Sequence, residues 1–284
     1  MAQQTLKPGS SPTGERTWNT DKLGLRLGFD AISAACAGAL VAPVIYIIDK
    51  SIMENASGRQ TLVSSIKSSL RQLVTHPRST LLSKPTGLIF LLYGGTYLTA
   101  NALDTATSTL KSERASHVTS GTAKFAASSA ANIGLCIYKD QVFVRMFGPP
   151  GAVPRPVPSI SYALFTLRDC LTIFASFNLP PLLGPILDER LSDRVRRHVS
   201  GMSCAQFAAP AAVQVISTPL HLLGLDMYNR PSGSGAPSWS DRWAQVKGTW
   251  APSTLARMCR IIPAFGVGGV VNRSVRENLM HRVE

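Results

Sequence analysis

Long apolar stretches alternate with shorter polar segments along the whole chain. Six of these stretches have roughly the length of a bilayer span, and the segments between them are basic and rich in proline and glycine. A bilayer core needs about 20 mostly apolar residues per helix, so the chain has room for six spans with short connections. The pattern predicts an all-α membrane protein with six transmembrane helices. The stretches are Leu25–Met53, Leu88–Leu110, Ala123–Phe147, Ile160–Leu187, Met202–Tyr228 and Pro252–Leu279.

The stretches also repeat in pairs. Pro43, Tyr138 and Pro219 hold equivalent places near the ends of the first, third and fifth stretches, with spacings of 95 and 81 residues. Internal similarity of this kind is typical of repeat architectures. We therefore expect three pseudo-repeats of helix pairs within a single domain over residues 23–284, after a disordered polar tail over 1–22. The three repeats are predicted at residues 25–112, 120–192 and 200–282.

Two polar segments carry membrane-surface signals. Between Asn55 and Ser83, apolar residues recur at helical period around Lys67 and Arg71, which predicts an amphipathic surface helix. Before the last stretch stand three tryptophans, a residue type enriched at membrane interfaces. We interpret these tryptophans as interface anchors. They are Trp239, Trp243 and Trp250.

Composition agrees with a membrane protein. Only 16% of the residues are charged, against about 25% in an average soluble domain. The mean hydropathy of +0.11 is moderate, as expected for helices that face lipid on one side and a polar cavity on the other. The net charge of +13 comes mainly from residues between apolar stretches, a distribution typical of membrane-protein loops. An alanine-rich soluble helical protein remains an alternative, and no motif favours nucleic-acid binding.

Enzymatic, metal-binding and disulfide functions have no support in the residue pattern. No zinc-protease, serine-hydrolase or phosphate-loop motif occurs, so we expect neither an enzyme nor a cofactor. The five cysteines lie singly inside apolar stretches, where we expect them to be small buried residues. No secretory signal is evident. The cysteines are Cys36, Cys136, Cys170, Cys204 and Cys259.

The sixth stretch gives the clearest match to a known family. Arg260 and Pro263, followed by Phe265 and the pair Gly268-Gly269, resemble the final helix of mitochondrial carriers. That family has three repeats, each with two transmembrane helices and a short matrix-side helix. Its odd-numbered helices end in the motif P-x-[DE]-x-x-[KR]-x-[KR]. The resemblance implies a mitochondrial carrier fold of solute carrier 25 type.

The resemblance extends over residues 25–280 but departs from the family at the motif charges. Asp140 and Arg145 match the acid and the last basic residue of the third stretch, whereas Pro43 and Pro219 match the other motifs mainly through their prolines. In the family these charges pair into a ring that closes the matrix gate. Because of these departures, the resemblance supports the carrier fold more strongly than it supports ordinary transport activity.

Three charges lie well inside apolar stretches: Arg168, Asp169 and Arg260. A charge in a transmembrane helix costs about 2.5–3.5 kcal/mol on insertion scales, so it usually faces a cavity or a partner. The resemblance places Arg168 and Arg260 at substrate-contact positions, and two guanidinium groups would favour a carboxylate or phosphate. We take all three residues as candidates for substrate binding. In the alternative, Arg168 pairs locally with Asp169 and Arg260 reaches the interface.

Other residues are assigned to a gate or to helix geometry. Asp140, Arg145 and His221 are candidate gate residues; the alternatives are a helix-end salt bridge for the first two and a structural role for His221. Lys139 is expected at the interface. Prolines inside helices remove a hydrogen bond and bend the helix. The predicted kinks are Pro43, Pro219 and Pro263.

These observations favour transport of a small anionic metabolite across the mitochondrial inner membrane by alternating access. We expect a monomer in contact with membrane lipid, including anionic lipid such as cardiolipin, without nucleic acid. The second hypothesis is a carrier-fold scaffold, receptor or insertion factor that no longer transports, in the inner or outer mitochondrial membrane. Its motivation is the loss of gate charges.

Overall fold

The computed structural model describes residues 18–118, 121–192, 196, 199–231 and 236–284, and these residues contain helices and no strand. Most of the predicted N-terminal tail lies outside the described residues. The amphipathic surface helix is confirmed as α2. The helices are α1 (Leu23–Ala56), α2 (Leu62–Thr75), α3 (Pro77–Leu81), α4 (Lys84–Leu110), α5 (Thr122–Phe147), α6 (Ser159–Arg190), α8 (Gly201–Ala212), α9 (Gln214–Asn229), α10 (Trp239–Cys259), the π-helix η1 (Ile262–Val267) and α11 (Gly268–Met280).

Local capping chemistry sets several helix starts. The Ser83 hydroxyl accepts a hydrogen bond from the backbone N–H of Thr86, and Pro85 occupies the first turn, where its missing N–H costs nothing. At α10, Ser238 and Asp241 form a reciprocal capping box. These caps satisfy backbone groups that would otherwise lack partners at the helix ends.

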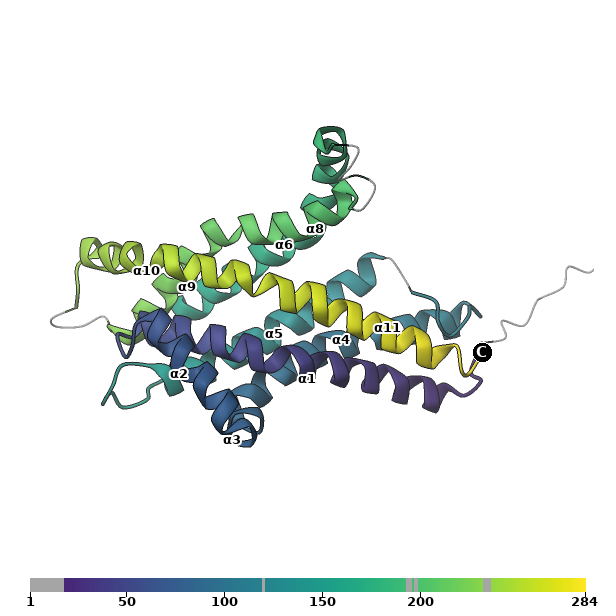
Figure 1. Ribbon diagram of the computed structural model, residues 1–284, viewed down its shortest axis with the longest axis horizontal. Helices are drawn as coiled ribbons and strands as arrows, with labels where there is room; N and C mark the ends of the chain where they lie inside the picture. The colour runs from purple at the N-terminus through teal and green to yellow at the C-terminus, as the bar shows by residue number, and fades with distance from the viewer. Residues whose placement is uncertain (1–17, 119–120, 193–195, 197–198, 232–235) are drawn as a thin grey trace, which may run out of the picture.

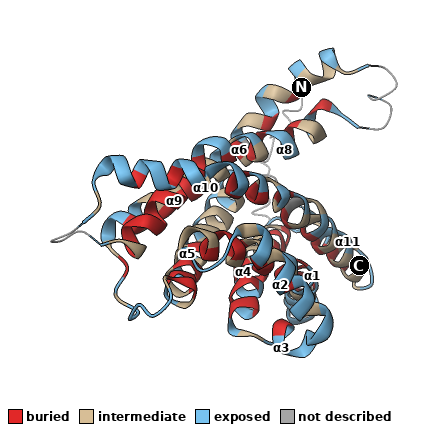
Figure 2. Ribbon diagram, turned by 60° about the vertical axis from the view of Figure 1, so that its left-hand side comes forward, coloured by how far each residue is buried: buried red, intermediate tan, exposed pale blue. Residues whose placement is uncertain are grey.

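The long helices close into a ring. α1 packs against α4, α4 against α5, and α5 against α6; α6 packs against α8 and α9, α9 against α10, and α11 returns to α1. Figure 1 shows α1, α4, α5 and α11 running along the long axis of the molecule, while α8 and the end of α6 form an arm that leaves the bundle. Buried residues concentrate on the faces that these helices turn toward one another (Figure 2).

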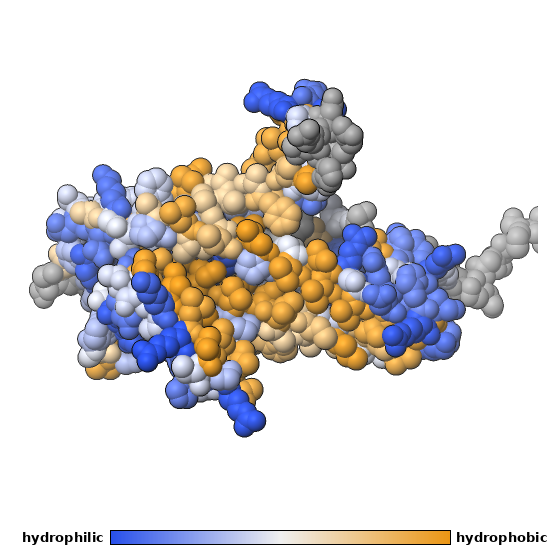
Figure 3. Space-filling view, viewed as in Figure 1, coloured by the Kyte–Doolittle hydropathy of each residue, from blue (hydrophilic) through white to orange (hydrophobic). Residues whose placement is uncertain are grey.

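An apolar band crosses the face of the bundle seen in Figure 3. In Figure 3 apolar residues cover the middle of the visible face, and hydrophilic residues gather at both ends. Three helical segments are long and apolar enough to cross a membrane, and α6 would make a fourth if its bent halves form one span. The structure thus supports a multi-pass all-α membrane protein and confirms the six-span prediction only in part. The three segments are Leu23–Ala56, Gly201–Asn229 and Trp239–Met280.

Helix irregularities occur near several prolines. The two halves of α6 meet at 43°, immediately before Pro180 and Pro181. Pro263 lies in the first turn of η1, a π-helix that continues the axis of α10 into α11. Pro43 and Pro219 lie inside α1 and α9, which continue past them. Their role as kinks stays a prediction.

Small residues allow α1 and α4 to approach closely. A Cβ atom on Gly38 would lie 3.1 Å from the backbone nitrogen of Gly94, so the two backbones touch at this point. Close contact through small residues is typical of helix packing in membranes. By contrast, a Cβ on Gly269 would meet nothing within 4 Å, so this glycine is not at a close helix contact.

The cysteines depart from the sequence-based expectation. Cys136 is buried, but Cys36, Cys170 and Cys259 are exposed on the bundle surface and Cys204 is half-buried. Apolar stretches in a membrane protein have a lipid-facing side as well as a packed side, so an apolar neighbourhood in sequence does not imply burial in the protein. All five thiols are free.

Candidate functional site

A buried set of charged side chains joins five helices. We call this set the central network: Asp49, Lys139, Asp140, Arg168, Asp169, His221 and Arg260. α1 supplies the first residue, α5 the next two, α6 the following pair and α9 the histidine, while Arg260 caps the end of α10. Residues from distant parts of the sequence therefore meet in one polar centre inside an otherwise apolar bundle.

Asp49 connects α1 to two other helices. Its Oδ2 lies 2.8 Å from Lys139 Nζ, and its Oδ1 lies 2.7 Å from Arg260 Nη1. Lys139 Nζ also lies 2.6 Å from Oδ1 of its sequence neighbour Asp140. One carboxylate thus ties α1 to both α5 and the C-terminal end of α10.

Arg168 connects α6 to two further helices. Its Nε and Nη2 donate to the two oxygens of Asp169, at 2.9 and 2.7 Å. Nη2 also donates to Asp140 Oδ2 at 2.7 Å, and Nη1 lies 2.7 Å from His221 Nδ1. Because a guanidinium group can only donate, Nδ1 of His221 accepts, which puts the proton of a neutral ring on Nε2. Arg168 is 1% exposed, so these partners replace its water.

Charge is balanced within the central network. Asp49, Asp140 and Asp169 face Lys139, Arg168 and Arg260, three negative against three positive groups. Buried charges in membranes are tolerated when they are paired in this way. The balanced pairs connect the helices that carry them.

Arg257 adds a buried positive charge beside this balanced set. Its Nε donates to Gln214 Oε1 at 2.8 Å, while its buried Nη2 has no hydrogen-bond partner among the described residues. The side chain is 2% exposed. Sequence reasoning missed Arg257, although its place one turn before Arg260 on the same helix was a usable signal.

Two further residues of the network escaped the sequence analysis. Lys139 was expected at the interface but is 2% exposed, and Asp49 was not considered. Both lie near the ends of apolar stretches, where a charge ordinarily contacts water. Their pairing depends on residues about 90 positions apart, and no local pattern signals that contact.

The candidate gate residues separate in space. Asp140 and His221 belong to the central network, but Arg145 is exposed and lines a different pocket with Arg59 and Arg155. Arg145 therefore lies apart from the other two candidates, and the gate role of all three stays a prediction.

A small cavity lies next to the central network. It has a volume of about 90 Å³, and both Asp169 and Arg260 line it. The rest of its wall combines hydroxyl and amide groups with apolar side chains. Tyr97 closes one side through a hydrogen bond from its hydroxyl to the Ala264 carbonyl at 2.6 Å. The wall consists of Leu92, Tyr93, Thr96, Tyr97, Asn132, Cys136, Asp169, Thr172, Ile173, Arg260, Ile261 and Ala264.

A second buried polar set joins α1, α4 and α11. We call it the terminal network: Arg26, Asp30, Asn101, Thr105, Ser108, Asn272 and Arg276. Asp30 is its centre, since its oxygens accept from Thr105 Oγ1 at 2.5 Å and from Arg276 Nε at 2.7 Å. Asn101 and Asn272 exchange two hydrogen bonds of 2.9 Å. Nearby, Lys124 of α5 pairs with Asp104 of α4 at 2.7 Å.

The cavity lies between the two networks along the bundle. On α5 the order is Lys124 beside the terminal network, Asn132 and Cys136 in the cavity wall, then Lys139 in the central network. From α10 to α11 the order runs from Arg260 of the central network through Ala264 of the cavity wall to Asn272 of the terminal network, while α4 carries cavity and terminal-network residues only. On α1, Asp30 and Asp49 are 19 residues apart, which is about 28 Å of helix and close to the thickness of a bilayer core.

The end of the molecule beyond the terminal network carries a wider pocket of about 540 Å³, lined by side chains of both signs. Glu284 lies there. Burial alone would raise the pKa of its carboxyl, but hydrogen bonds from the Ser116 backbone N–H and from His281 outweigh burial and lower that pKa.

Comparison with known families identifies the chain. A family model described as "Probable citrulline exporter" matches residues 33–280, which is most of the 284 residues. The chain therefore belongs to this family. No curated protein matches it.

Family membership corrects one prediction and confirms others. The resemblance to mitochondrial carriers is wrong as a family assignment, because the matching family is that of the citrulline exporters. The motifs behind it were a proline in the first and third repeats, Tyr138 at that place in the second, and scattered charges, a pattern that other helical membrane proteins can share. The chain is a multi-pass membrane transporter for a small metabolite and not an enzyme, as predicted.

Proposed function

We propose that this protein transports citrulline, a neutral zwitterionic amino acid, and that Asp169 and Arg260 bind its two charged groups. The observation that carries the proposal is that one acid and one base line the same cavity in the middle of the bundle. From the sequence we expected an anionic substrate. Citrulline has the carboxylate that this expectation required, but its ammonium group needs an acid as well, and Asp169 provides one.

Arg260 suits the carboxylate of the substrate. It donates to Asp49 through Nη1, and the hydrogen bonds found among the described residues leave its Nε and Nη2 for a ligand. A guanidinium group binds a carboxylate through two parallel hydrogen bonds. Asp169 is bound by Arg168, yet each carboxylate oxygen accepts more than one hydrogen bond, so a substrate ammonium can join it.

The uncharged part of the wall suits a ureido group. Tyr93 and Asn132 can donate to the ureido oxygen, while Thr96 and Thr172, whose hydroxyl protons go to backbone carbonyls, can accept from its nitrogens. Leu92 and Ile173 provide apolar surface for the methylene chain. This division of polar and apolar groups is typical of small-molecule sites, which measure about 300–1,000 Å³. The cavity of about 90 Å³ therefore has to widen before it holds a whole citrulline molecule.

The two networks suit alternating closure around that site. Each crosses several helices, and the cavity lies between them. Transport requires a midplane site that is closed from one side at a time. We propose that the substrate carboxylate replaces the protein partner of Arg260 and that the substrate ammonium group replaces the protein partner of Asp169. This exchange of ion pairs opens the central network.

The non-transporting scaffold hypothesis loses its motivation. It relied on absent gate charges, but Asp49 and Lys139 supply charges that the sequence motifs did not indicate. Six spans, a monomer and the mitochondrial inner membrane stay our proposals for topology, assembly and compartment. Fractionation of intact cells, with outer-membrane and inner-membrane markers, tests the compartment.

The function is tested with purified protein in liposomes preloaded with unlabelled citrulline, by uptake of labelled citrulline. We expect saturable exchange by the wild type and a loss of at least about tenfold for Arg260→Ala and Asp169→Asn, since one charge-assisted hydrogen bond is worth about 1.5–3 kcal/mol. Arg273→Ala serves as the control, because Arg273 is exposed and pairs only within its own helix with Glu277. Folded wild-type protein that exchanges no citrulline would contradict the proposal.

A further inference from the structure

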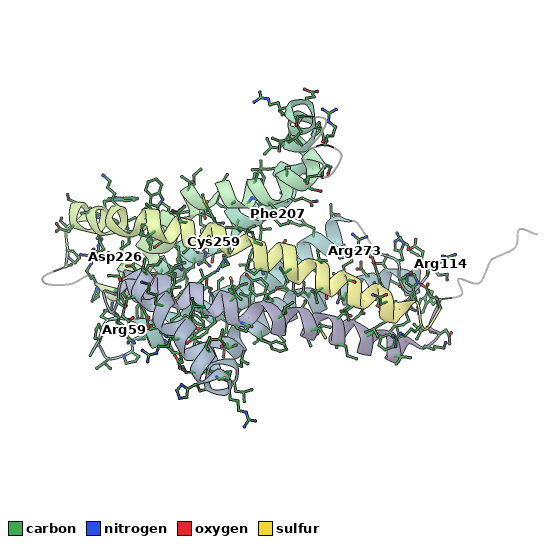
Figure 4. All side chains as sticks on the ribbon, in the orientation of Figure 1. Arg59, Arg114, Phe207, Asp226, Cys259 and Arg273 are labelled. Carbon is green, nitrogen blue, oxygen red and sulfur yellow. The ribbon has the colours of Figure 1, made fainter. Side chains whose placement is uncertain are left out.

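A second pocket lies at the end of the molecule beyond the central network. It has a volume of about 250 Å³, and its lining contains three arginines and no acidic residue. In Figure 4, Arg59 marks this end, far from Arg114 and Arg273 at the other. We name it the arginine pocket. Its lining is Arg59, Arg145, Gly148, Pro149, Ala152, Val153, Pro154, Arg155, Tyr228, Asn229 and Pro231.

Two of the three arginines are held in place by the protein. Arg59 donates through Nε to the Gly148 carbonyl. The Arg155 guanidinium lies over the Tyr228 ring, with 5.4 Å from its central carbon to the ring centroid. Arg155 Nη2 is buried and has no hydrogen-bond partner among the described residues. A buried donor without a partner is costly, and an anion in the pocket would satisfy it.

Two acids at this end of the molecule are engaged with other partners. Asp226, also labelled in Figure 4, pairs with Arg230 and Arg242 at 2.5 Å each. Glu54 accepts a hydrogen bond of 2.5 Å from Ser65. The pocket therefore keeps a positive charge that the protein itself does not neutralise.

The wall is shaped for a compact ligand. A Cβ atom on Gly148 would lie 2.8 Å from the Val144 carbonyl oxygen and 3.4 Å from the Tyr228 ring, so glycine is required for the close approach of the link after α5. That link is stiffened by Pro149, Pro154 and other prolines. A rigid, multiply basic pocket of this size fits a phosphate group, which arginine binds through paired hydrogen bonds.

We infer that the arginine pocket binds a phosphate group and thereby connects the ends of α1, α5 and α9. Arg59 follows α1, Arg145 lies in the last turn of α5, and Tyr228 lies in the last turn of α9. These three helices also carry Asp49, Asp140 and His221 of the central network. A bound phosphate would hold their ends together and favour the state in which the central network is closed.

The phosphate could belong to a lipid headgroup or to a soluble ion, and the test separates the two. Full-length protein is reconstituted in nanodiscs of phosphatidylcholine alone or with phosphatidylglycerol, and its thermal unfolding is followed with and without inorganic phosphate. We expect the wild type to be stabilised by one of these anions. Stabilisation by phosphatidylglycerol alone identifies a lipid headgroup, and stabilisation by inorganic phosphate in phosphatidylcholine identifies a soluble ion.

Two double variants, each of which removes two positive charges, test whether the anion binds in the arginine pocket. Arg145→Gln/Arg155→Gln removes two pocket arginines, and Arg273→Gln/Arg282→Gln removes two exposed arginines at the opposite end. The pocket variant should weaken anion binding by about tenfold or more per lost pair, and the control should not. Arg155→Lys, which keeps the charge but not the paired donors, should give an intermediate loss and replaces the double variant if that does not fold. Equal stabilisation of all variants, or of none including the wild type, overturns the inference.

Discussion

At the scale of residues, the stability of this protein depends on buried ion pairs. Asp49 and Lys139 are 4% and 2% exposed and the side chain of Arg260 is 13% exposed, so the three groups have lost most of their water and depend on one another. Removing one partner from a buried pair is far more costly than removing the whole pair, because an uncompensated charge remains. The central network should therefore be sensitive to single neutral substitutions.

We predict that Asp49→Asn lowers the free energy of unfolding by about 3–5 kcal/mol, because Lys139 and Arg260 lose their shared carboxylate. Thermal unfolding of the detergent-solubilised protein measures the effect. Glu277→Gln is the matched control; its pair with Arg273 is partly exposed and is worth only about 0–1 kcal/mol. Equal melting temperatures for the two variants would refute the assigned role of Asp49.

Residue types and local pattern indicated part of the site. Arg168, Asp169 and Arg260 could be identified because a charge deep inside an apolar stretch needs a partner or a cavity. Asp49, Lys139 and Arg257 could not, since near helix ends a charge usually reaches water. Which of these end charges is buried depends on how helices distant in sequence pack, and the spacing of residues along one helix carries no information on that.

At the scale of elements, the contact between α1 and α4 organises one side of the ring. Gly38 and Gly94 bring the two backbones together, and the same helices carry Asp30 and Asn101 of the terminal network. A bulky side chain at this contact would separate the helices and thereby lengthen the hydrogen bonds of the network. The helices of the first four stretches and their approximate limits followed from the hydrophobic stretches. The division of the fifth stretch into α8 and α9, the start of α10 at Trp239, the π-helix η1 and the bend in α6 did not, because none of them has a distinctive spacing.

We predict that Gly38→Leu destabilises the protein by about 1–3 kcal/mol through overpacking against α4. Gly87→Leu, in α4 itself, is the control, because a Cβ on Gly87 meets nothing within 4 Å. Chemical or thermal unfolding in detergent compares the two. The interpretation of the α1–α4 contact fails if Gly87→Leu is the more destabilising substitution.

At the scale of the whole molecule, the apolar band separates two polar ends. α2 lies at one end and the C-terminus at the other (Figure 1), with the cavity between the central and terminal networks. The two ends should contact opposite aqueous compartments. The apolar stretches in the sequence predicted this band. The family followed only from comparison with known families, because the short motifs that resemble those of mitochondrial carriers are too few to distinguish one family from another.

Cysteine labelling tests this topology. In a background without native cysteines, Arg71→Cys on α2 and Arg282→Cys near the C-terminus should react with a membrane-impermeant maleimide from opposite sides of sealed vesicles. Both positions are exposed, so access depends only on the side of the membrane. Labelling of both from the same side would rule out the proposed orientation of the bundle.

The central claim is that Arg260 binds the carboxylate and Asp169 the ammonium group of one zwitterionic substrate. The most direct measurement is competition of labelled citrulline exchange by two analogues, one without the α-amino group and one with the carboxylate converted to an amide. For the wild type, both analogues should compete at least about tenfold more weakly than citrulline. The Asp169→Asn variant should no longer prefer citrulline over the analogue without the α-amino group, but should still prefer it over the amide. The Arg260→Gln variant should no longer prefer citrulline over the amide, but should still prefer it over the analogue without the α-amino group. If both variants keep both preferences, the two residues do not bind the substrate's charged groups.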